Sequence, residues 1–284
     1  MAQKYSLSLS SFILLVIFSG MAILALFPLY ALTLASLKPA KELLRFGLNV
    51  KFDLEIMNFT NYIEILSATT KTGQNYLAWY KNSILVTVLF TASSLLLSSM
   101  VGYGLAMYKF KWRNVIFGAV LVVLTIPVEI IMLPLYKLAI VLKIINTYSG
   151  VILPFMVAPL PIFFFRQYAS GLEKEFMDAG RVDGCSEMGI FFRIMVPLML
   201  PAFGAMAILQ ALGSWNNFLW PLIVLKTTDQ LTLPIGLATL LTPYGNNYQV
   251  LIAGSVLAIV PILILFVMFQ RYFVSGLTVG GVKG

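Results

Sequence analysis

The sequence predicts an all-α, polytopic membrane protein with six transmembrane helices. Of its 284 residues, 60% are hydrophobic and only 11% are charged, and the mean hydropathy is +0.93. Soluble domains are about 45–50% apolar and about 25% charged, so a soluble chain of this composition would lack the polar side chains needed to cover its surface. At about 20 residues per span, the length leaves room for roughly six or seven helices and their loops.

Six apolar runs follow one another along the chain, separated by charged or by proline- and glycine-containing segments. The first run is longer than the apolar part of a signal peptide, which has about 7–15 residues, so it is expected to remain as a span. The third contains Pro127 and Pro134, and an internal proline breaks or kinks a helix. We expect a single transmembrane domain over residues 1–284, with spans at about 11–36, 83–107, 115–136, 149–165, 197–224 and 250–270.

Basic residues in the loops predict the orientation of the chain. The net charge is +8, from 19 Lys and Arg against 11 Asp and Glu, without a run of five basic residues; this favours contact with membrane lipid over nucleic acid. With both termini on one side, that side carries ten basic residues and the other nine. The loop 37–81 holds six of those nine together with four acids, and without it the split is ten to three. Both termini are therefore expected in the cytoplasm, with the protein in the inner or plasma membrane.

The residue inventory argues against an enzyme and against a metal site. The chain has no histidine, which removes the commonest general base and metal ligand, and its one cysteine, Cys185, cannot form an internal disulfide. Neither a G-x-x-x-x-G-K-[ST] phosphate loop nor a G-x-G-x-x-G turn occurs. We expect no catalytic residues, no metal and no cofactor.

A charged loop at residues 166–193 is unusual in so apolar a chain. An Asp183-Gly184 turn is expected inside it, because glycine accepts a positive φ, and Ser186 is expected to cap the helix that follows. The small residues Ala179, Gly180 and Gly184 would let another protein approach closely, although a solvated loop with a chance helical pattern has the same composition. The expected helices cover residues 173–182 and 186–194.

The same loop resembles the E-A-A-x3-G-x9-I-x-L-P motif of the membrane subunits of ABC importers: it reads Asp178-Ala179-Gly180, three residues, Gly184, nine residues, Ile194, one residue and Val196-Pro197. Two departures from the motif matter. Asp178 replaces the usual glutamate and has a shorter reach, and Gly180 replaces an alanine, at a helix cost of about 1 kcal/mol.

The resemblance extends over nearly the whole chain and is greatest to the second permease of maltose-type sugar importers, in the carbohydrate branch of the family. The matching segments are Arg181-Val182-Asp183-Gly184, similar to A-R-I-D-G; Ser214 to Leu222, similar to W-N-x-F-x-x-P-L; Leu231-Thr232-Leu233-Pro234; and the ending Gly276 to Gly284.

This resemblance implies the ABC importer type I permease fold and a set of partners. They are a second, homologous permease, a dimer of cytoplasmic ATP-binding subunits that binds the ATP, an extracytoplasmic solute-binding protein, and a sugar substrate. It also implies that residues 166–193, called the coupling loop below, sit in a cleft of the ATPase, with the tail from Gly276 nearby and the loop 225–249 facing the binding protein. The docking residues carried over are Asp178, Ala179, Gly180, Arg181, Asp183, Gly184, Ile194 and Pro197.

Polar side chains at the end of the fifth expected span are candidates for the translocation pathway. An amide without a partner is costly in lipid, so these groups should face protein or water. They could form interhelical hydrogen bonds and an aromatic belt, or line a pathway in which aromatic faces stack on sugar rings. The candidates are Gln210, Asn216, Asn217, Trp215 and Trp220. Glu129, between Pro127 and Pro134, is expected at a solvated or salt-bridged helix end.

Two alternatives stay open on the residues alone. One is a permease for another solute, such as glycerol phosphate, amino acids or polyamines. The other is a secondary carrier driven by protons or sodium, which would need titratable or ion-coordinating groups inside the membrane and usually internal repeats. Uptake that survives collapse of the proton gradient while ATP is maintained would argue against a proton-driven carrier. The sequence does not name the sugar.

Overall fold

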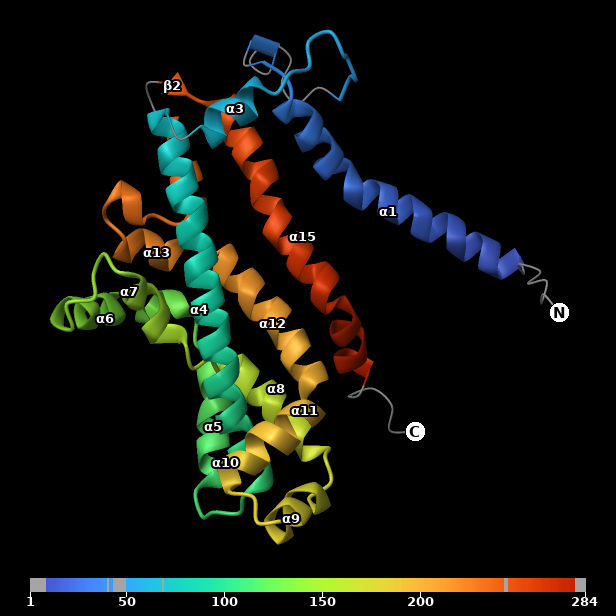
Figure 1. Ribbon diagram of the computed structural model, residues 1–284, viewed down its shortest axis with the longest axis vertical. Helices are drawn as coiled ribbons and strands as arrows, with labels where there is room; N and C mark the ends of the chain where they lie inside the picture. The colour runs from blue at the N-terminus through green and yellow to red at the C-terminus, as the bar shows by residue number, and fades with distance from the viewer. Residues whose placement is uncertain (1–8, 40, 43–49, 68, 243–244, 279–284) are drawn as a thin grey trace. The chain divides into compact units, whose positions relative to one another are not determined.

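The computed structural model describes residues 9–39, 41–42, 50–67, 69–242 and 245–278 (Figure 1). The expected all-α class is confirmed. Within these residues the only strands are β1 (Leu241–Thr242) and β2 (Gly245–Asn246), which form a two-residue antiparallel hairpin in the register Leu241↔Asn246 and Thr242↔Gly245. The ends of the chain used for the charge count, Lys4 and Lys283, and Pro243 lie outside the described residues.

The chain divides into two compact units. The first combines the described residues up to Tyr76 with 237–259, and holds α1 (Leu9–Ser36) and α3 (Thr60–Leu66). Its buried centre joins Ile65 to Tyr76, whose hydroxyl donates to the carbonyl of Gly254 at 3.0 Å. A side chain at Gly254 would place its Cβ 2.8 Å from Ile65 Cδ1, so glycine allows this close packing.

The second unit comprises residues 77–236 and the described residues from 260, and it contains both candidate sites. Its longest helix is α4 (Lys71–Met107), which begins in the first unit. The elements that follow are α5 (Arg113–Leu124), α6 (Val128–Val141), α7 (Tyr148–Ile152), η1 (Leu153–Phe155), α8 (Pro159–Ser170), α9 (Glu175–Val182), α10 (Glu187–Ile190), η2 (Phe191–Met195), α11 (Val196–Leu198), α12 (Leu200–Trp215), α13 (Leu219–Val224), η3 (Thr228–Gln230), α14 (Leu233–Ala238) and α15 (Tyr248–Thr278).

Three described helices are long and apolar enough to cross a membrane: α1, α4 from Thr72, and α15 as far as Arg271. Three helix pairs meet the same criterion only as bent pairs, so the described residues offer between three and six spans. The bends measure 103° between α5 and α6, 45° between 148–155 and α8, and 80° between 187–198 and α12.

The helices differ from the expected spans mainly at prolines. The expected third span, 115–136, turns sharply at Pro127, which has extended backbone (φ −60°, ψ 130°) and cannot donate a helical hydrogen bond. Pro134 stays inside α6. The expected fifth span, 197–224, is divided into α11, α12 and α13, and α4 begins at Lys71 rather than 83.

A methionine-rich core packs the coupling loop against α4 and α8. Tyr103 on α4, Phe165 on α8 and Met177 on α9 are buried together with residues of α10 and η2. The helices approach closely at Gly102, where a Cβ would lie 2.7 Å from Phe165 Cβ and 2.9 Å from the backbone nitrogen of the next residue. The other buried members are Met107, Ala169, Ile190, Phe191, Met195, Met199, Ala202 and Met206. This core holds the coupling loop against α4 and α8.

Candidate functional site

The coupling loop turns at Gly184, as the sequence predicts. Gly184 has φ +78°, a left-handed conformation that glycine adopts without steric cost. The N–H of Gly184 donates to the carbonyl of Arg181 at 3.0 Å, and the N–H of Cys185 donates to the carbonyl of Gly180 at 2.9 Å. These two hydrogen bonds with a left-handed glycine form a Schellman motif, which ends α9 and reverses the chain.

The second helix of the loop starts at the predicted cap. Ser186 has extended backbone, and its Oγ accepts from the N–H of Gly189 at 3.1 Å, which confirms it as the N-cap. The helix widens into a π-helical turn over η2. After α11, which contains Pro197, the chain bends by 80° into α12. The loop is therefore joined to α12 through a bent, irregular connection.

The predicted docking residues do not all face outward. Six are exposed: Asp178, Ala179, Arg181, Asp183, Gly184 and Pro197. Gly180 was expected to make room for another protein, but it is buried, and a Cβ there would lie 2.7 Å from Cδ1 of Ile194 and 3.1 Å from Cγ1 of Ile190. Its small size lets α9 pack on its own chain, and the half-buried Ile194 belongs to that contact.

Apolar side chains on the same surface were missed by sequence reasoning. Val182 is 88% exposed, Met188 52% and Phe192 47%. An open hollow of about 770 Å³ lies beside the turn. It is lined by Asp183, Gly184, Cys185, Ser186, Met188, Gly189, Phe192 and Arg193. Part of this surface could have been predicted from the sequence. Met188 and Phe192 are four residues apart and therefore share one face of a helix, and Val182 lies next to the predicted turn.

A polar cluster connects the two helices of the loop to the residue after α4. Arg181 Nε donates to Glu187 Oε1 at 2.8 Å, and Nη1 donates to Asp178 Oδ1 at 3.1 Å. The hydroxyl of Tyr108 donates to Glu187 Oε2. The hydrogen bond from Arg181, then that from Tyr108, lowers the pKa of the Glu187 carboxyl, while the bond to Glu187 raises the pKa of Arg181. Burial first, and then the hydrogen bond to Glu187, raises the pKa of Tyr108.

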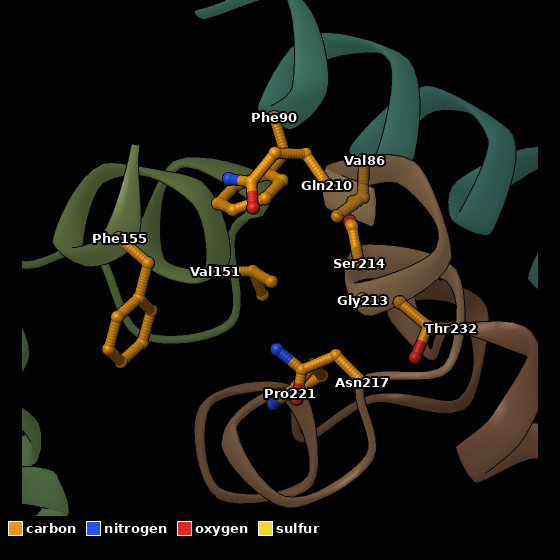
Figure 2. A pocket seen from close by; sticks show the side chains of 10 residues that line it. All are labelled: Val86, Phe90, Val151, Phe155, Gln210, Gly213, Ser214, Asn217, Pro221 and Thr232. Carbon is orange, nitrogen blue, oxygen red and sulfur yellow. The ribbon is translucent and has the colours of Figure 1, made fainter. Parts of the chain in front are cut away.

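A pocket of about 210 Å³ opens between α4, α7, η1 and α12 (Figure 2). Gln210 and Asn217 face it from opposite sides, with Val151 and Phe155 along one wall and Ser214 and Thr232 along the other (Figure 2). The complete lining is Val86, Phe90, Val151, Phe155, Gln210, Gly213, Ser214, Asn217, Pro221 and Thr232. We call it the pathway pocket.

The pathway pocket combines an apolar wall with hydrogen-bonding groups. Gln210 Nε2 donates to Ser94 Oγ at 2.7 Å, which fixes the orientation of its amide. Thr232 is 4% exposed, and its Oγ1 has no hydrogen-bond partner among the described residues. A buried hydroxyl without a partner costs free energy that a hydrogen-bonding ligand would recover. The pocket is suited to a neutral, hydroxyl-rich molecule.

The other pathway candidates lie elsewhere. Asn216 forms the C-cap of α12, and its Nδ2 donates to the carbonyl of Leu212 at 3.0 Å. It lines a neighbouring hollow of about 400 Å³ together with Glu129 and Trp220. Trp220 is 1% exposed, its Nε1 donates to a backbone carbonyl of α7 at 3.1 Å, and Trp215 is 5% exposed. Both tryptophans are therefore packed inside the protein.

Gln210 and Asn217 meet in the pocket as their spacing of about two turns predicts, whereas Ser214, Thr232, Phe90 and Phe155 were missed. Ser214 could have been found, because it lies four residues after Gln210 on the same helical face. Thr232 and the two phenylalanines come from other segments, and only the folded structure brings them to the pocket.

A second hydrogen-bond network holds the segment after α13 on α4. Trp79 Nε1 donates to the carbonyl of Thr228 at 2.7 Å, and Asn82 Nδ2 donates to the carbonyl of Leu231 at 2.9 Å. The hydroxyl of Tyr148 donates to Asn82 Oδ1 at 2.6 Å, so both the nitrogen and the oxygen of the Asn82 side-chain amide are hydrogen-bonded. Of the expected loop 225–249, the part up to Leu233 is thus firmly attached to α4.

Comparison with known proteins places the chain in a family. Residues 94–279 match the model of the binding-protein-dependent transport system inner membrane component. The chain belongs to this family. Members of the binding-protein-dependent transport family are membrane-embedded permease components without enzymatic activity, so the absence of catalytic residues from the sequence agrees with the family assignment. The same membership favours the ATP-driven importer over the secondary carrier.

Two relatives match almost the full length of the chain. The arabinooligosaccharides transport system permease protein AraQ of Bacillus subtilis (strain 168) is 57% identical over 267 residues, 94% of each chain. The protein of the same name from Halalkalibacterium halodurans is 58% identical over 274 residues, 96% of this chain and 97% of the relative. A crystal structure of a bacterial ABC transporter involved in alginate import shares the fold, with a TM-score of 0.77 at 21% identity over 96% of this chain and 99% of that chain.

Proposed function

We propose that the chain is one transmembrane permease subunit of an ATP-driven importer for oligosaccharides that contain arabinose. The observation that carries this proposal is the identity of 57–58% to two AraQ proteins over at least 94% of both chains. The hydroxyl- and amide-bearing pathway pocket supports a sugar over an ionic solute, because neither an acidic nor a basic side chain lines it.

The proposed complex contains a second permease, which forms the other half of the pathway, two cytoplasmic ATP-binding subunits, which bind the ATP, and a solute-binding protein. We propose that both termini lie in the cytoplasm, as the distribution of basic residues in the loops predicts. The coupling loop then faces the ATPase, and the segment held by Trp79 and Asn82 faces the binding protein. The tail from Gly276 is proposed to lie at the ATPase; residues 279–284 are outside the described part of the chain.

The coupling loop would dock through its exposed residues. Asp178, Ala179, Asp183 and Gly184 offer the polar and small part of the surface, and the exposed side chain of Val182 offers an apolar contact. Closure of the ATPase on ATP would displace α9 and α10, and the shared core would transmit this to α4 and α8. Nucleotide binding and sugar access are then coupled at a distance.

The pathway pocket would take one sugar ring at a time. Gln210 and Asn217 offer amide groups from opposite sides, Thr232 offers a hydroxyl, and Phe155 and Phe90 provide aromatic surface. Its volume of about 210 Å³ suits a single ring better than a complete oligosaccharide. The oligosaccharide would then pass through the pocket one ring after another. Because only one ring is held at a time, each bound state stays weak enough for the sugar to be released.

The test is uptake into proteoliposomes that contain the complete complex, with loaded binding protein and ATP inside. Uptake of arabinooligosaccharides that requires both and survives collapse of the proton gradient supports the function. Uptake that follows the proton gradient contradicts it. Gly184→Trp should abolish sugar-stimulated ATP hydrolysis while membrane insertion persists, and normal stimulation would refute the docking assignment.

The pocket has its own test in the same assay. We expect Gln210→Ala and Asn217→Ala to lower uptake at saturating binding protein by about 5- to 30-fold, corresponding to the loss of one buried hydrogen bond worth about 1–2 kcal/mol. Gln270→Ala, which removes an exposed amide from α15, is the matched control. If all three variants show equal uptake and an unchanged preference between arabinobiose and arabinotriose, the proposal that the pathway pocket binds the sugar is refuted.

A further inference from the structure

We infer that Glu187 is a positioning residue for transport coupling, which joins the docking surface of the coupling loop to the end of α4 through Arg181 and Tyr108. The inference rests on the proposed function. It assigns a role to two residues, Glu187 and Tyr108, that lie outside the docking surface and outside the pathway pocket.

The geometry makes Glu187 the meeting point of three segments. One carboxylate oxygen accepts from Arg181 Nε on α9 at 2.8 Å, and the other accepts from Arg181 Nη2 at 3.3 Å and from the hydroxyl of Tyr108. Both oxygens of one carboxylate on α10 are thus committed. A two-pronged guanidinium–carboxylate contact fixes direction as well as distance.

Tyr108 is itself held firmly at the end of α4. Its ring packs edge-on against Tyr103, with centroids 5.6 Å apart and planes at 90°. Tyr103 is 4% exposed, and its hydroxyl contacts Met177 Sδ at 3.4 Å. The phenol that reaches Glu187 therefore belongs to the packed core, so the hydrogen bond connects that core to the loop.

The exposure of the cluster separates positioning from stability. The side chains of Arg181, Asp178 and Glu187 are 40%, 66% and 50% exposed, and exposed ion pairs contribute little to folding stability. The turn between α9 and α10 is open, since nothing lies within 4 Å of a Cβ built at Gly184. The Glu187 contacts thus set the direction of α10 relative to α9 and α4 without being needed for folding.

A displacement of the docking surface can then reach α4 by two routes. One is the buried methionine-rich core, which is deformable because methionine is flexible. The other is the directional Tyr108–Glu187–Arg181 link. Loss of the link should leave the loop docked and the ATPase active, while less of each ATPase closure is converted into movement of α4.

The experiment compares the complete reconstituted complex carrying Glu187→Gln, Tyr108→Phe, or both, and measures sugar taken up per ATP hydrolysed. Tyr108→Phe removes one hydroxyl and keeps the ring contact with Tyr103. Glu175→Gln is the matched control: it removes the same charge from an exposed position on α9, and within the described residues Glu175 makes no ion pair. Co-purification of the ATPase with each variant reports docking.

We expect each single variant to lower the uptake per ATP by about three- to tenfold, the scale on which residues along a coupling route act. The double variant should be no worse than the worse single variant, because both changes break one link. ATPase co-purification and the Glu175→Gln ratio should stay at wild-type values.

Several outcomes would overturn the inference. An unchanged ratio in Tyr108→Phe shows that the phenol is irrelevant, and loss of ATPase co-purification in Glu187→Gln shows that Glu187 docks directly. Effects that multiply in the double variant show two independent roles. These outcomes differ from failure of the proposed function, in which the wild-type complex itself shows no ATP-dependent sugar uptake.

Discussion

Replacement of Gly184 by alanine should destabilise the turn of the coupling loop, and the free-energy cost should come from the backbone conformation alone. Gly184 has φ +78°, and no atom lies within 4 Å of a Cβ built on it, so a new methyl group meets no steric obstacle. The left-handed conformation costs a residue with a Cβ about 1–2 kcal/mol. Asparagine tolerates this region better than alanine, so Gly184→Asn should cost less.

Hydrogen–deuterium exchange of the permease in detergent measures this cost directly. The amides of Gly184 and Cys185 form the two bonds of the Schellman motif, and they exchange when the turn opens. A cost of about 1–2 kcal/mol predicts exchange about 5- to 30-fold faster in Gly184→Ala, with Gly184→Asn between it and the wild type.

Gly171 provides the control for this measurement. It is exposed and also ends a helix, but its φ is −86° and a Cβ would lie at an ordinary 3.4 Å from the carbonyl oxygen of Tyr168. Gly171→Ala should leave exchange around it within about twofold of wild type, as for an unstrained surface substitution. Equal acceleration in both alanine variants, or none in Gly184→Ala, would refute the reasoning.

Three further predictions concern the second unit. Gly236→Ala would place a Cβ 2.0 Å from Cδ2 of the buried Trp79 ring. We expect it to lower the free energy of unfolding by about 1–3 kcal/mol or more, measured by thermal unfolding in detergent. An unfolding curve identical to that of the wild type would contradict this. Trp220→Phe leaves the carbonyl of Gly150 without its buried donor. This should lower the free energy of unfolding by about 1–3 kcal/mol in the same assay, and an unchanged free energy of unfolding would show that the bond does not stabilise the fold. Because the arginine partner lowers the pKa of Glu187 below 4.5, the carboxylate is ionised in the fold at neutral pH. Its contribution to exchange protection of the coupling loop should therefore be constant above about pH 5 and vanish as the pH falls through the lowered pKa; a loss of this protection between pH 6 and 8 would contradict it.

Much of the fold could be predicted because lipid imposes a simple rule on sequence. Apolar runs had to be helices, and Pro127 marked a break that the structure shows as a 103° bend. The angle itself was not predictable, since a proline ends a helix but does not choose the direction of the next one. The division of 197–224 into three helices was missed because hydropathy averaged over a segment does not report where helices end inside it.

The coupling loop was more readable than the pathway. Gly184 and Ser186 act locally, so their roles followed from the adjacent residues. Gly180 was misjudged because a small residue permits close approach on either side of a helix, and only packing shows that its neighbour is Ile194 of the same chain. The contact between Tyr108 and Glu187 spans 79 positions, and no periodicity in one sequence connects residues so far apart.

The length and continuity of α4 have a consequence for how the two ends of this helix move together. The helix contains no proline. It carries the Trp79 and Asn82 attachments near one end, and Tyr103, which belongs to the methionine-rich core, near the other. At 1.5 Å per residue, Trp79 and Tyr103 are about 36 Å apart along the axis. A stiff rod of this length acts as a lever: a tilt of about 10° around its midpoint moves the ends about 3 Å in opposite directions. A displacement of the Tyr103 end in one direction is then accompanied by a displacement of the Trp79 end in the opposite direction, so movement of the two ends in antiphase follows from the shape of one helix.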